Sequence, residues 1–236
     1  MRLHKAYNGL TVLFFCIFFN AKVHPQTDSV LANKTYQIAD SLFSMGLYAQ
    51  SNEHYIKSQK MYFKIAETVD DNTYRVKYYK CFADIAYNLN LLAKQDEAIA
   101  MLVKAIDETK IKIGNEHFVV GNLYNCLGEV YSRKGDYPAA LENHKKSLTI
   151  NINALGAEHR SVGASYGNIA IVHYYTGDYQ KAIEYDLKAR DIFEKNLGSD
   201  HPHVASIDNN LGEIYRILKN YDEALVYYNK SITIWS

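Results

Sequence analysis

Apolar residues recur three and four positions apart along most of this chain, which is the spacing of one face of an α-helix. One such run consists of Leu123, Leu127, Val130 and Tyr131. Gly135 and Asp136 interrupt it, and a second apolar stripe begins near Tyr137. The pattern therefore predicts a helix, a short turn and a second helix.

This helix–turn–helix pattern repeats with a period of 42 residues, as the spacing of His117, His159 and His201 shows. The stretch LGEVYSRKGDYPAALENHKKSLTI returns as IAIVHYYTGDYQKAIEYDLKARDI and again as LGEIYRILKNYDEALVYYNKSITI. A weaker copy around Ile85 precedes these three, and a more distant copy around Ile38 lies 47 residues before it. A fixed period of this length predicts a solenoid, in which each unit buries its apolar face against its neighbours.

The repeats predict an all-α chain of about five helical hairpins. Their approximate ranges are 31–66, 72–113, 116–155, 158–197 and 200–236. Small residues are expected wherever two helices approach closely. In the first helices these are Gly128, Ala170 and Gly212, and in the second helices they are Ala140, Ala182 and Ala224.

A glycine, an acid and a histidine precede three of the predicted first helices, as GNEH, GAEH and GSDH. Metal binding is one reading of this motif. Equivalent side chains of stacked helices are about 8–10 Å apart, however, whereas Zn–N bonds measure about 2.0–2.1 Å. We therefore expect no metal site. The glycine ends one helix, and the acid and the histidine begin the next, with the carboxylate near the positive helix end and Pro202 in the first turn.

The repeat resembles the tetratricopeptide repeat, whose pattern contains an aromatic residue, Leu-Gly, Tyr and Ala. The residues that carry the resemblance are Tyr124, Leu127, Gly128, Tyr131 and Ala140, and in the last copy Leu211, Gly212, Tyr215, Ala224 and Tyr228. Asp208 departs from the pattern in the last copy, and Ala170 and His173 depart from it in the fourth. The period of 42 and the segment LGSDHPHVA are similar to the kinesin-light-chain type of this repeat.

The resemblance implies a right-handed superhelix whose concave groove binds a peptide or a protein segment. It implies no catalytic activity and no cofactor. It also implies that asparagines on the first helices hydrogen-bond the ligand backbone. Asn168 and Asn210 occupy that column, whereas Asp84 and Cys126 interrupt it.

Helical spacing indicates which other residues face the groove. Asn122, Asn125, Glu129 and Arg133 lie on one face of a first helix, and Ser206, Asn209, Glu213 and Arg216 repeat that face two units later. Ala164, Gly167, Ile171 and Tyr175 lie between them and are smaller or apolar. We therefore expect a groove with polar ends and a shallow apolar middle; an ordinary solvated surface is the alternative. The predicted site comprises Asn122, Asn125, Glu129, Arg133, Asn168, Tyr175, Asn209, Asn210, Glu213 and Arg216.

The N-terminus differs from the repeats. Arg2 and Lys5 precede an apolar run from Leu10 to Phe19, which is typical of a secretory signal peptide and is shorter than the roughly 20 residues that span a bilayer. We expect residues 1–26 to be a leader and 27–236 to be the repeat array, exported to the periplasm or secreted. A buried first helix is the alternative. No disulfide is expected between the remaining cysteines, Cys81 and Cys126.

Charge and motifs narrow the functional classes. The chain has 26 basic and 26 acidic residues and no basic stripe, so a nucleic acid is not an expected partner. No catalytic signature occurs, and the isolated His54 and His144 are expected at the surface. We expect a non-catalytic module that binds a peptide or a protein. The alternative is a sensory or scaffold part of a larger enzyme, such as a caspase-like protease or a histidine kinase. Self-association through an uncapped C-terminal hairpin is a further expectation.

Overall fold

The computed structural model describes residues 24–235, and the side chains of all but the last of these. The expected leader, residues 1–26, lies outside this part of the chain except for its last three residues. Its assignment stays a prediction. Pro25 is the first residue of the first helix, which therefore begins before Leu31, where the first hairpin was expected to start.

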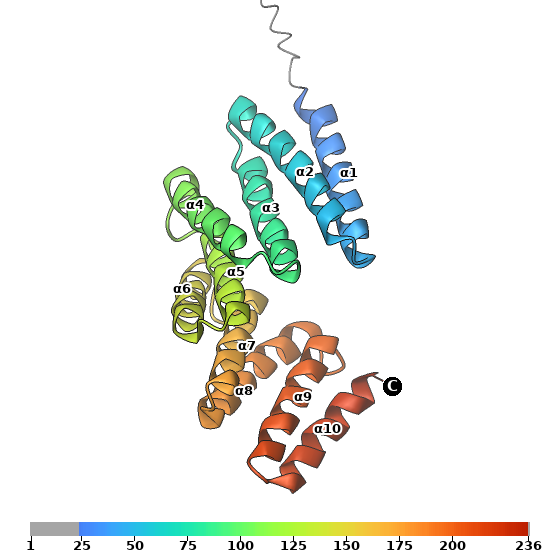
Figure 1. Ribbon diagram of the computed structural model, residues 1–236, viewed down its shortest axis with the longest axis vertical. Coiled ribbons are helices and arrows are strands. Elements are labelled where there is room, and N and C mark those ends of the chain that lie inside the picture. Colours follow the sequence, from blue (N-terminus) through green and yellow to red (C-terminus); the bar gives the residue numbers. More distant parts are fainter. Residues whose placement is uncertain (1–23, 236) are drawn as a thin grey trace, which may run out of the picture.

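The described chain consists of ten α-helices, and no strand occurs in residues 24–235. Their bounds are α1 (Pro25–Ser44), α2 (Tyr48–Val69), α3 (Asn72–Leu91), α4 (Gln95–Ile113), α5 (Phe118–Lys134), α6 (Tyr137–Leu155), α7 (Arg160–Tyr175), α8 (Tyr179–Leu197), α9 (Pro202–Ile217) and α10 (Tyr221–Trp235). Consecutive helices pair as hairpins, and the hairpins stack along a curved path with α1 and α10 at its two ends (Figure 1). The predicted all-α superhelix of helical hairpins is confirmed.

Glycines end three of the second helices. Gly114, Gly156 and Gly198 follow α4, α6 and α8 with φ angles of 101°, 88° and 91°, a region of backbone conformation that other residues rarely adopt. The predicted role of these glycines as helix ends is confirmed. Each one starts the short connection to the next hairpin.

The histidines of the repeated motif cap the first helices, although not as expected. In each case Nδ1 accepts a hydrogen bond from the backbone N–H two residues on. The distances are 3.3 Å for His117, 3.1 Å for His159 and 3.1 Å for His201. The imidazole thus provides the acceptor that was assigned to the acid. Two of the acids instead contact the second helix of their own hairpin: Glu116 accepts from Asn153 at 3.2 Å, and Glu158 pairs with Lys195 at 3.2 Å.

Large side chains, rather than the facing backbone, occupy the space beside two of the small first-helix residues. A methyl group on Gly128 would lie 2.6 Å from the ring of His144, and one on Gly212 would lie 2.8 Å from the ring of Tyr228. His144 is only 1% exposed, so its expected surface position was wrong. The glycines are therefore needed because a ring lies against them.

One repeat position carries a different residue in each hairpin. Leu102, His144, Asp186 and Tyr228 are spaced by 42 residues and lie in α4, α6, α8 and α10. Leu102, His144 and Asp186 are almost completely buried. A position that packs the hairpin in one repeat therefore carries a polar or ionisable group in three others.

The departure of Asp208 from the aromatic repeat position has a structural explanation. Its side chain is fully buried, and Arg190 Nε donates to its Oδ1 at 2.6 Å. One hairpin earlier the same two positions carry Leu148 and Tyr166. A buried ion pair therefore lies at the junction of α8 and α9, where the preceding junction carries a leucine and a tyrosine.

Candidate functional site

Two adjoining hollows lie along the first helices of the last four hairpins, and we call them together the groove. The first has a volume of about 590 Å³ and is lined by Tyr87, Asn90, Glu129, Ser132, Arg133, Tyr137, His144, Asn168, Ile171 and Tyr175. The second has a volume of about 240 Å³ and is lined by Ala170, Ile171, Tyr174, Tyr175, Asp186, Asn209, Asn210, Glu213 and Ile214. Ile171 and Tyr175 line both hollows, so the two lie next to each other.

Most of the residues predicted for the site line the groove. These are Glu129, Arg133, Asn168, Tyr175, Asn209, Asn210 and Glu213. The other three do not. Asn122 is half-buried on α5 and lines neither hollow. Asn125 also lines neither hollow, but its Oδ1 lies 3.1 Å from Nδ1 of His144, which lines the first. Arg216 is exposed and pairs with Glu213.

Sequence reasoning missed several lining residues. Tyr87, Asn90, Ser132, Tyr137, His144 and Asp186 were not among the predicted site residues. His144 and Asp186 belong to second helices, whereas the groove was expected on the first helices and His144 was expected at the surface. The polar substitutions at their shared repeat position were the available signal.

A hydrogen-bonded cluster forms one wall of the first hollow. Asn168 Nδ2 donates to Asn125 Oδ1 at 3.0 Å and to Glu129 Oε1 at 3.1 Å. Asn125 Nδ2 also donates to Glu129 Oε1 at 2.9 Å, and the ring nitrogen Nδ1 of His144 lies 3.1 Å from Asn125 Oδ1. These bonds join α5, α6 and α7, so the wall is held in one arrangement.

Burial shifts the pKa values of both ionisable groups in this cluster. It raises the pKa of Glu129, and the hydrogen bonds from Asn168 and Asn125 oppose that rise. It lowers the pKa of His144 to about 4, which keeps the ring neutral near pH 7. The amides of Asn125 and Asn168 are thus already hydrogen-bonded within the cluster. Arg133 also lines this hollow and carries a positive charge.

The residues shared by the two hollows are apolar or aromatic. Of the four residues expected in the apolar middle, Ile171 and Tyr175 line the groove, whereas Ala164 and Gly167 line neither hollow. Ile171 is 39% exposed and Tyr175 is 61% exposed. The ring of Tyr175 stacks on Tyr137 with centroids 5.8 Å apart, and Tyr174 contacts its edge at 5.4 Å. This cluster offers a face on which an apolar side chain can pack.

The second hollow contains two acids in different surroundings. Glu213 accepts hydrogen bonds from Arg216 Nε and from the Tyr228 hydroxyl, both at 2.8 Å, and these partners lower its pKa to about 2. Asp186 is 2% exposed, and its Oδ1 has no hydrogen-bond partner. Burial raises the pKa of Asp186 to about 8.

The asparagine column is interrupted, as predicted. Asp84 accepts from the Tyr36 hydroxyl and Cys126 is a free thiol, so neither supplies an amide. The side-chain amide of Asn168 already donates to Asn125 and Glu129 in the cluster of the first hollow. Among the described residues, the side chains of Asn209 and Asn210 have no hydrogen-bond partner and line the second hollow.

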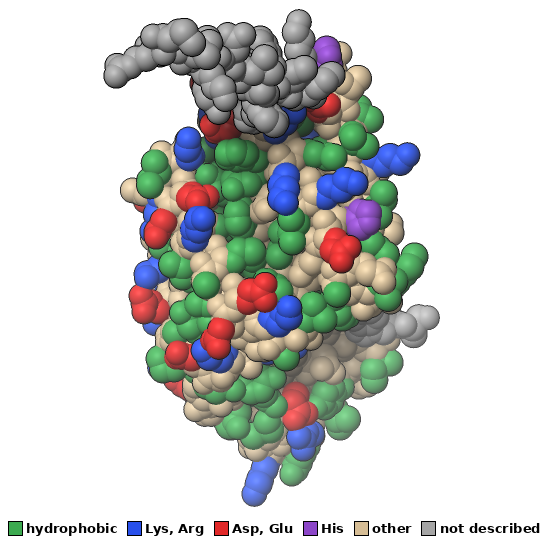
Figure 2. All heavy atoms as spheres, turned by 45° about the horizontal axis from the view of Figure 1, so that its top comes forward, with side chains coloured by type: hydrophobic (Ala, Val, Ile, Leu, Met, Phe, Trp, Pro, Cys, Tyr) green, Lys and Arg blue, Asp and Glu red, His purple; other side chains and the backbone are tan. Residues whose placement is uncertain are grey.

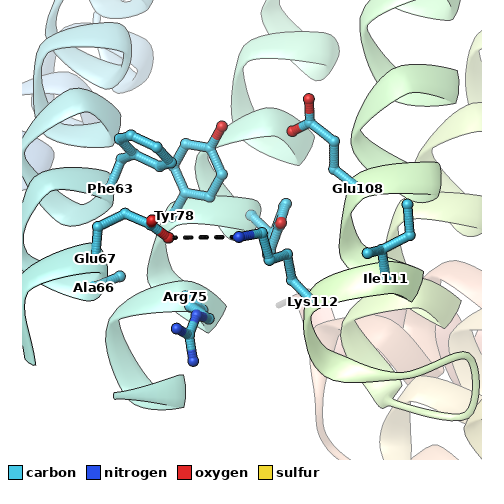
Figure 3. Close-up of a pocket in the computed structure, with 9 residues that line it drawn as sticks. Phe63, Ala66, Glu67, Arg75, Tyr78, Glu108, Ile111 and Lys112 are labelled. Atoms are coloured by element: carbon cyan, nitrogen blue, oxygen red, sulfur yellow. Dashed lines mark ion pairs between the residues drawn. The ribbon is translucent and has the colours of Figure 1, made fainter. Parts of the chain in front are cut away.

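A separate hollow of about 350 Å³ lies where α2, α3 and α4 meet (Figure 3). Phe63 and Tyr78 line it with ring centroids 5.3 Å apart, and Glu67 pairs with Lys112 across it at 3.9 Å. It contains none of the predicted residues. Its ion pair already satisfies an acid and a base, so the groove is the better candidate site.

Surface charge gives no single-signed patch on the face seen in Figure 2, where acidic and basic side chains are interspersed. No group of three or more His, Cys, Asp or Glu side chains within residues 24–235 is placed to hold a metal ion. None of the ten described helices is long and apolar enough to cross a membrane. The groove is therefore characterised by amides, aromatic rings and a few separate charges.

Comparison with known proteins identifies the repeats. The family model described as "Tetratricopeptide repeat" matches residues 119–195 and 164–236, which together cover half of the chain. Human outer dynein arm-docking complex subunit 4 is 37% identical over 54 residues. That alignment covers 23% of this chain and 8% of the human protein, so the likeness is confined to a small part of a much longer relative.

Solved structures share the fold over most of the chain. BtubC (BKLC) from P. vanneervenii matches with a TM-score of 0.65 and 18% identity, over 90% of this chain and 74% of that one. The nearly identical TPR-like repeats of a Podosopora anserina protein described as a kinesin light chain match with a TM-score of 0.63 and 19% identity, over 88% of this chain and 96% of that one. These likenesses show the architecture of stacked helical hairpins.

Proposed function

The chain belongs to the tetratricopeptide repeat family, and from this premise we propose that it binds an extended peptide or protein segment along its groove. Tetratricopeptide arrays support protein–protein interaction and are typically non-catalytic. The groove runs over several first helices, which suits an extended ligand better than a small molecule. The observation that carries the proposal is the pair of amides, Asn209 and Asn210, that line the groove and have no hydrogen-bond partner in the described part of the chain.

The chemistry of those amides fits a peptide backbone. An asparagine side chain offers two N–H donors and a carbonyl acceptor, which are the complements of a peptide C=O and N–H. A chain in extended conformation presents these groups along its whole length, whatever its side chains are. The aromatic middle around Tyr175 would pack an apolar residue of the same segment. Backbone recognition thus gives affinity, and the hollows give selectivity.

A peptide display experiment tests the proposal. A library of random 12-residue peptides is selected against the full array, and the affinity of the enriched peptides is then measured for Asn209→Ala and Asn210→Ala. We expect each variant to bind about tenfold more weakly, because a hydrogen bond to the peptide is lost. Asn229→Ala is the control, since Asn229 is exposed on α10 and lies in neither hollow. Equal binding by the groove variants and the control would remove the groove as the site.

We also propose that the array acts outside the cytoplasm. The support is the sequence of residues 1–26, with Arg2 and Lys5 before the apolar run Leu10 to Phe19. A fusion of residues 1–26 to bacterial alkaline phosphatase, which is active only after export, tests this. We expect an active fusion and loss of activity in Leu13→Arg, which breaks the apolar run. An inactive fusion would argue for a protein retained in the cytoplasm.

A further inference from the structure

We infer that the second hollow of the groove accepts a lysine or arginine side chain of the bound segment, with the Asp186 carboxylate as its ionic partner. The inference rests on the proposed peptide-binding function and specifies one position of the ligand. It assigns a ligand-binding role to a residue of a second helix, whereas the groove is formed mainly by first helices.

Asp186 has no hydrogen-bond or ion-pair partner within residues 24–235. It is 2% exposed, and its Oδ1 is buried without a hydrogen bond. No described Lys, Arg or His forms an ion pair with it, and burial is the cause of its raised pKa. Buried carboxyl groups are almost always hydrogen-bonded or paired with a cation. An unpaired one that lines a hollow therefore indicates that the partner comes from outside.

The residues at the position of Asp186 in the other hairpins either have a partner or carry no polar group. His144 bonds to Asn125 and Tyr228 bonds to Glu213, so each of these polar side chains has a partner inside the protein. Leu102 occupies the position in α4 without any polar group. Packing at this position therefore does not require a carboxyl group, and the acid of Asp186 is left to be explained by binding.

The surroundings of Asp186 suit a cation. Tyr174 and Tyr175 line the hollow, and aromatic rings attract ammonium and guanidinium groups. The carbonyl oxygens of Asn209 and Asn210 can accept hydrogen bonds from the same group. Glu213 is the other acid of the hollow, but Arg216 already neutralises its charge. Asp186 is thus the acid still available.

The volume of the second hollow and the protonation state of Asp186 are both consistent with the binding of one basic side chain. The hollow measures about 240 Å³, below the roughly 300 Å³ at which pockets for whole small molecules begin. With a pKa of about 8, Asp186 is largely protonated near pH 7 while the hollow holds no cation. An entering ammonium or guanidinium group favours the ionised form. Binding then transfers the Asp186 proton to solvent and forms the ion pair.

The experiment uses four pools of fluorescein-labelled 12-residue peptides with blocked termini. Each pool has one fixed central residue, which is Lys, Arg, norleucine or Glu, and random residues other than Lys and Arg elsewhere. Fluorescence anisotropy gives the apparent affinity of each pool for the whole array and for Asp186→Asn. Asp191→Asn is the matched control, because Asp191 is an exposed acid on the same helix that pairs with Lys195 at 2.8 Å.

We expect the wild-type array and Asp191→Asn to bind the Lys and Arg pools about tenfold more tightly than the norleucine pool. Asp186→Asn should lose that preference and bind the norleucine pool as the wild type does. Asp186→Leu, which copies Leu102, should behave in the same way and guards against an effect peculiar to the amide. A preference for Lys and Arg that survives in both variants, or that is absent from the wild type, would overturn the inference. Failure of every pool to bind would instead refute the proposed function on which it rests.

Discussion

Replacing Gly128 with alanine should destabilise the array, although alanine is the better helix former. The added methyl group would lie 2.6–2.8 Å from three atoms of the His144 ring. That ring cannot move aside easily, because it is buried and bonded to Asn125 at 3.1 Å. Overpacking of this kind costs about 1–3 kcal/mol, whereas the change from glycine to alanine in a helix gains about 0.5–1 kcal/mol. We therefore expect a net loss of about 0.5–2 kcal/mol.

The chain offers a matched control in Gly167. A methyl group there would meet only the Cβ of Ala189, at 3.9 Å, which is an ordinary contact. Gly167→Ala should therefore stabilise the array by about 0.5–1 kcal/mol. The same substitution is thus expected to have opposite signs at two first-helix positions.

Urea and thermal unfolding followed by circular dichroism measure both variants under identical conditions. A comparison of midpoints remains valid even if the repeats unfold in more than one step. Combining Gly128→Ala with His144→Leu copies Ala86 and Leu102 of the second hairpin and should recover much of the loss. Two results would refute the explanation that the His144 ring leaves no room for a methyl group. One is a Gly128→Ala array that is as stable as Gly167→Ala. The other is a double variant that is no more stable than Gly128→Ala.

Three further predictions concern buried charge and helix caps. Burial lowers the pKa of His144 in the folded state to about 4, so the stability due to its neutral form is present above pH 6.5 and is lost as the pH falls towards 4. In urea unfolding, the free energy of unfolding of the wild type should therefore fall by about 2 kcal/mol more than that of His144→Leu between pH 7 and pH 5. Equal losses in the two proteins would contradict this. Arg190→Leu should lower the free energy of unfolding by about 3–5 kcal/mol, because Asp208 is left buried and unpaired. Adding Asp208→Tyr should restore most of that loss. A smaller loss for Arg190→Leu alone in the same unfolding assay would show that Asp208 finds another partner. His159→Ala should lower the free energy of unfolding by about 1 kcal/mol, whereas His159→Asn should lower it less, since asparagine can still accept from Ser161 N–H; identical effects would argue against the cap.

The fold could be predicted from the sequence because the same signals for helix ends and packing recur in successive repeats. Gly114, Gly156 and Gly198 mark helix ends by their spacing alone, and the structure gives all three the positive φ angles that favour glycine. Identical spacing implies identical packing between neighbours, so the pattern of one hairpin predicts the others. The chemical origin of the helix starts was less predictable, because the acid and the histidine of the motif can both cap a helix.

The site could be predicted only in part, because the groove also includes residues at packing positions. Glu129 and Asn209 were identified from the exposed face of a helix, and both line the groove. His144 and Asp186 were not, because His144 was expected at the surface as an isolated histidine and Asp186 lies on a second helix, whereas the groove was expected on the first helices. Whether a buried polar residue finds a partner depends on side-chain geometry. His144 bonds to Asn125, whereas Asp186 Oδ1 has no partner in residues 24–235, and repeat spacing alone does not reveal this difference.

The stacking of hairpins has a mechanical consequence. The extensive contacts among the ten described helices join neighbours or next neighbours along the chain, such as α5 with α6 and α3 with α5. A force applied between α1 and α10 is therefore carried through the junctions in series, and each junction needs to yield only slightly for the array to lengthen. We therefore expect the array to stretch elastically under a small force and to unfold one hairpin at a time under a larger one.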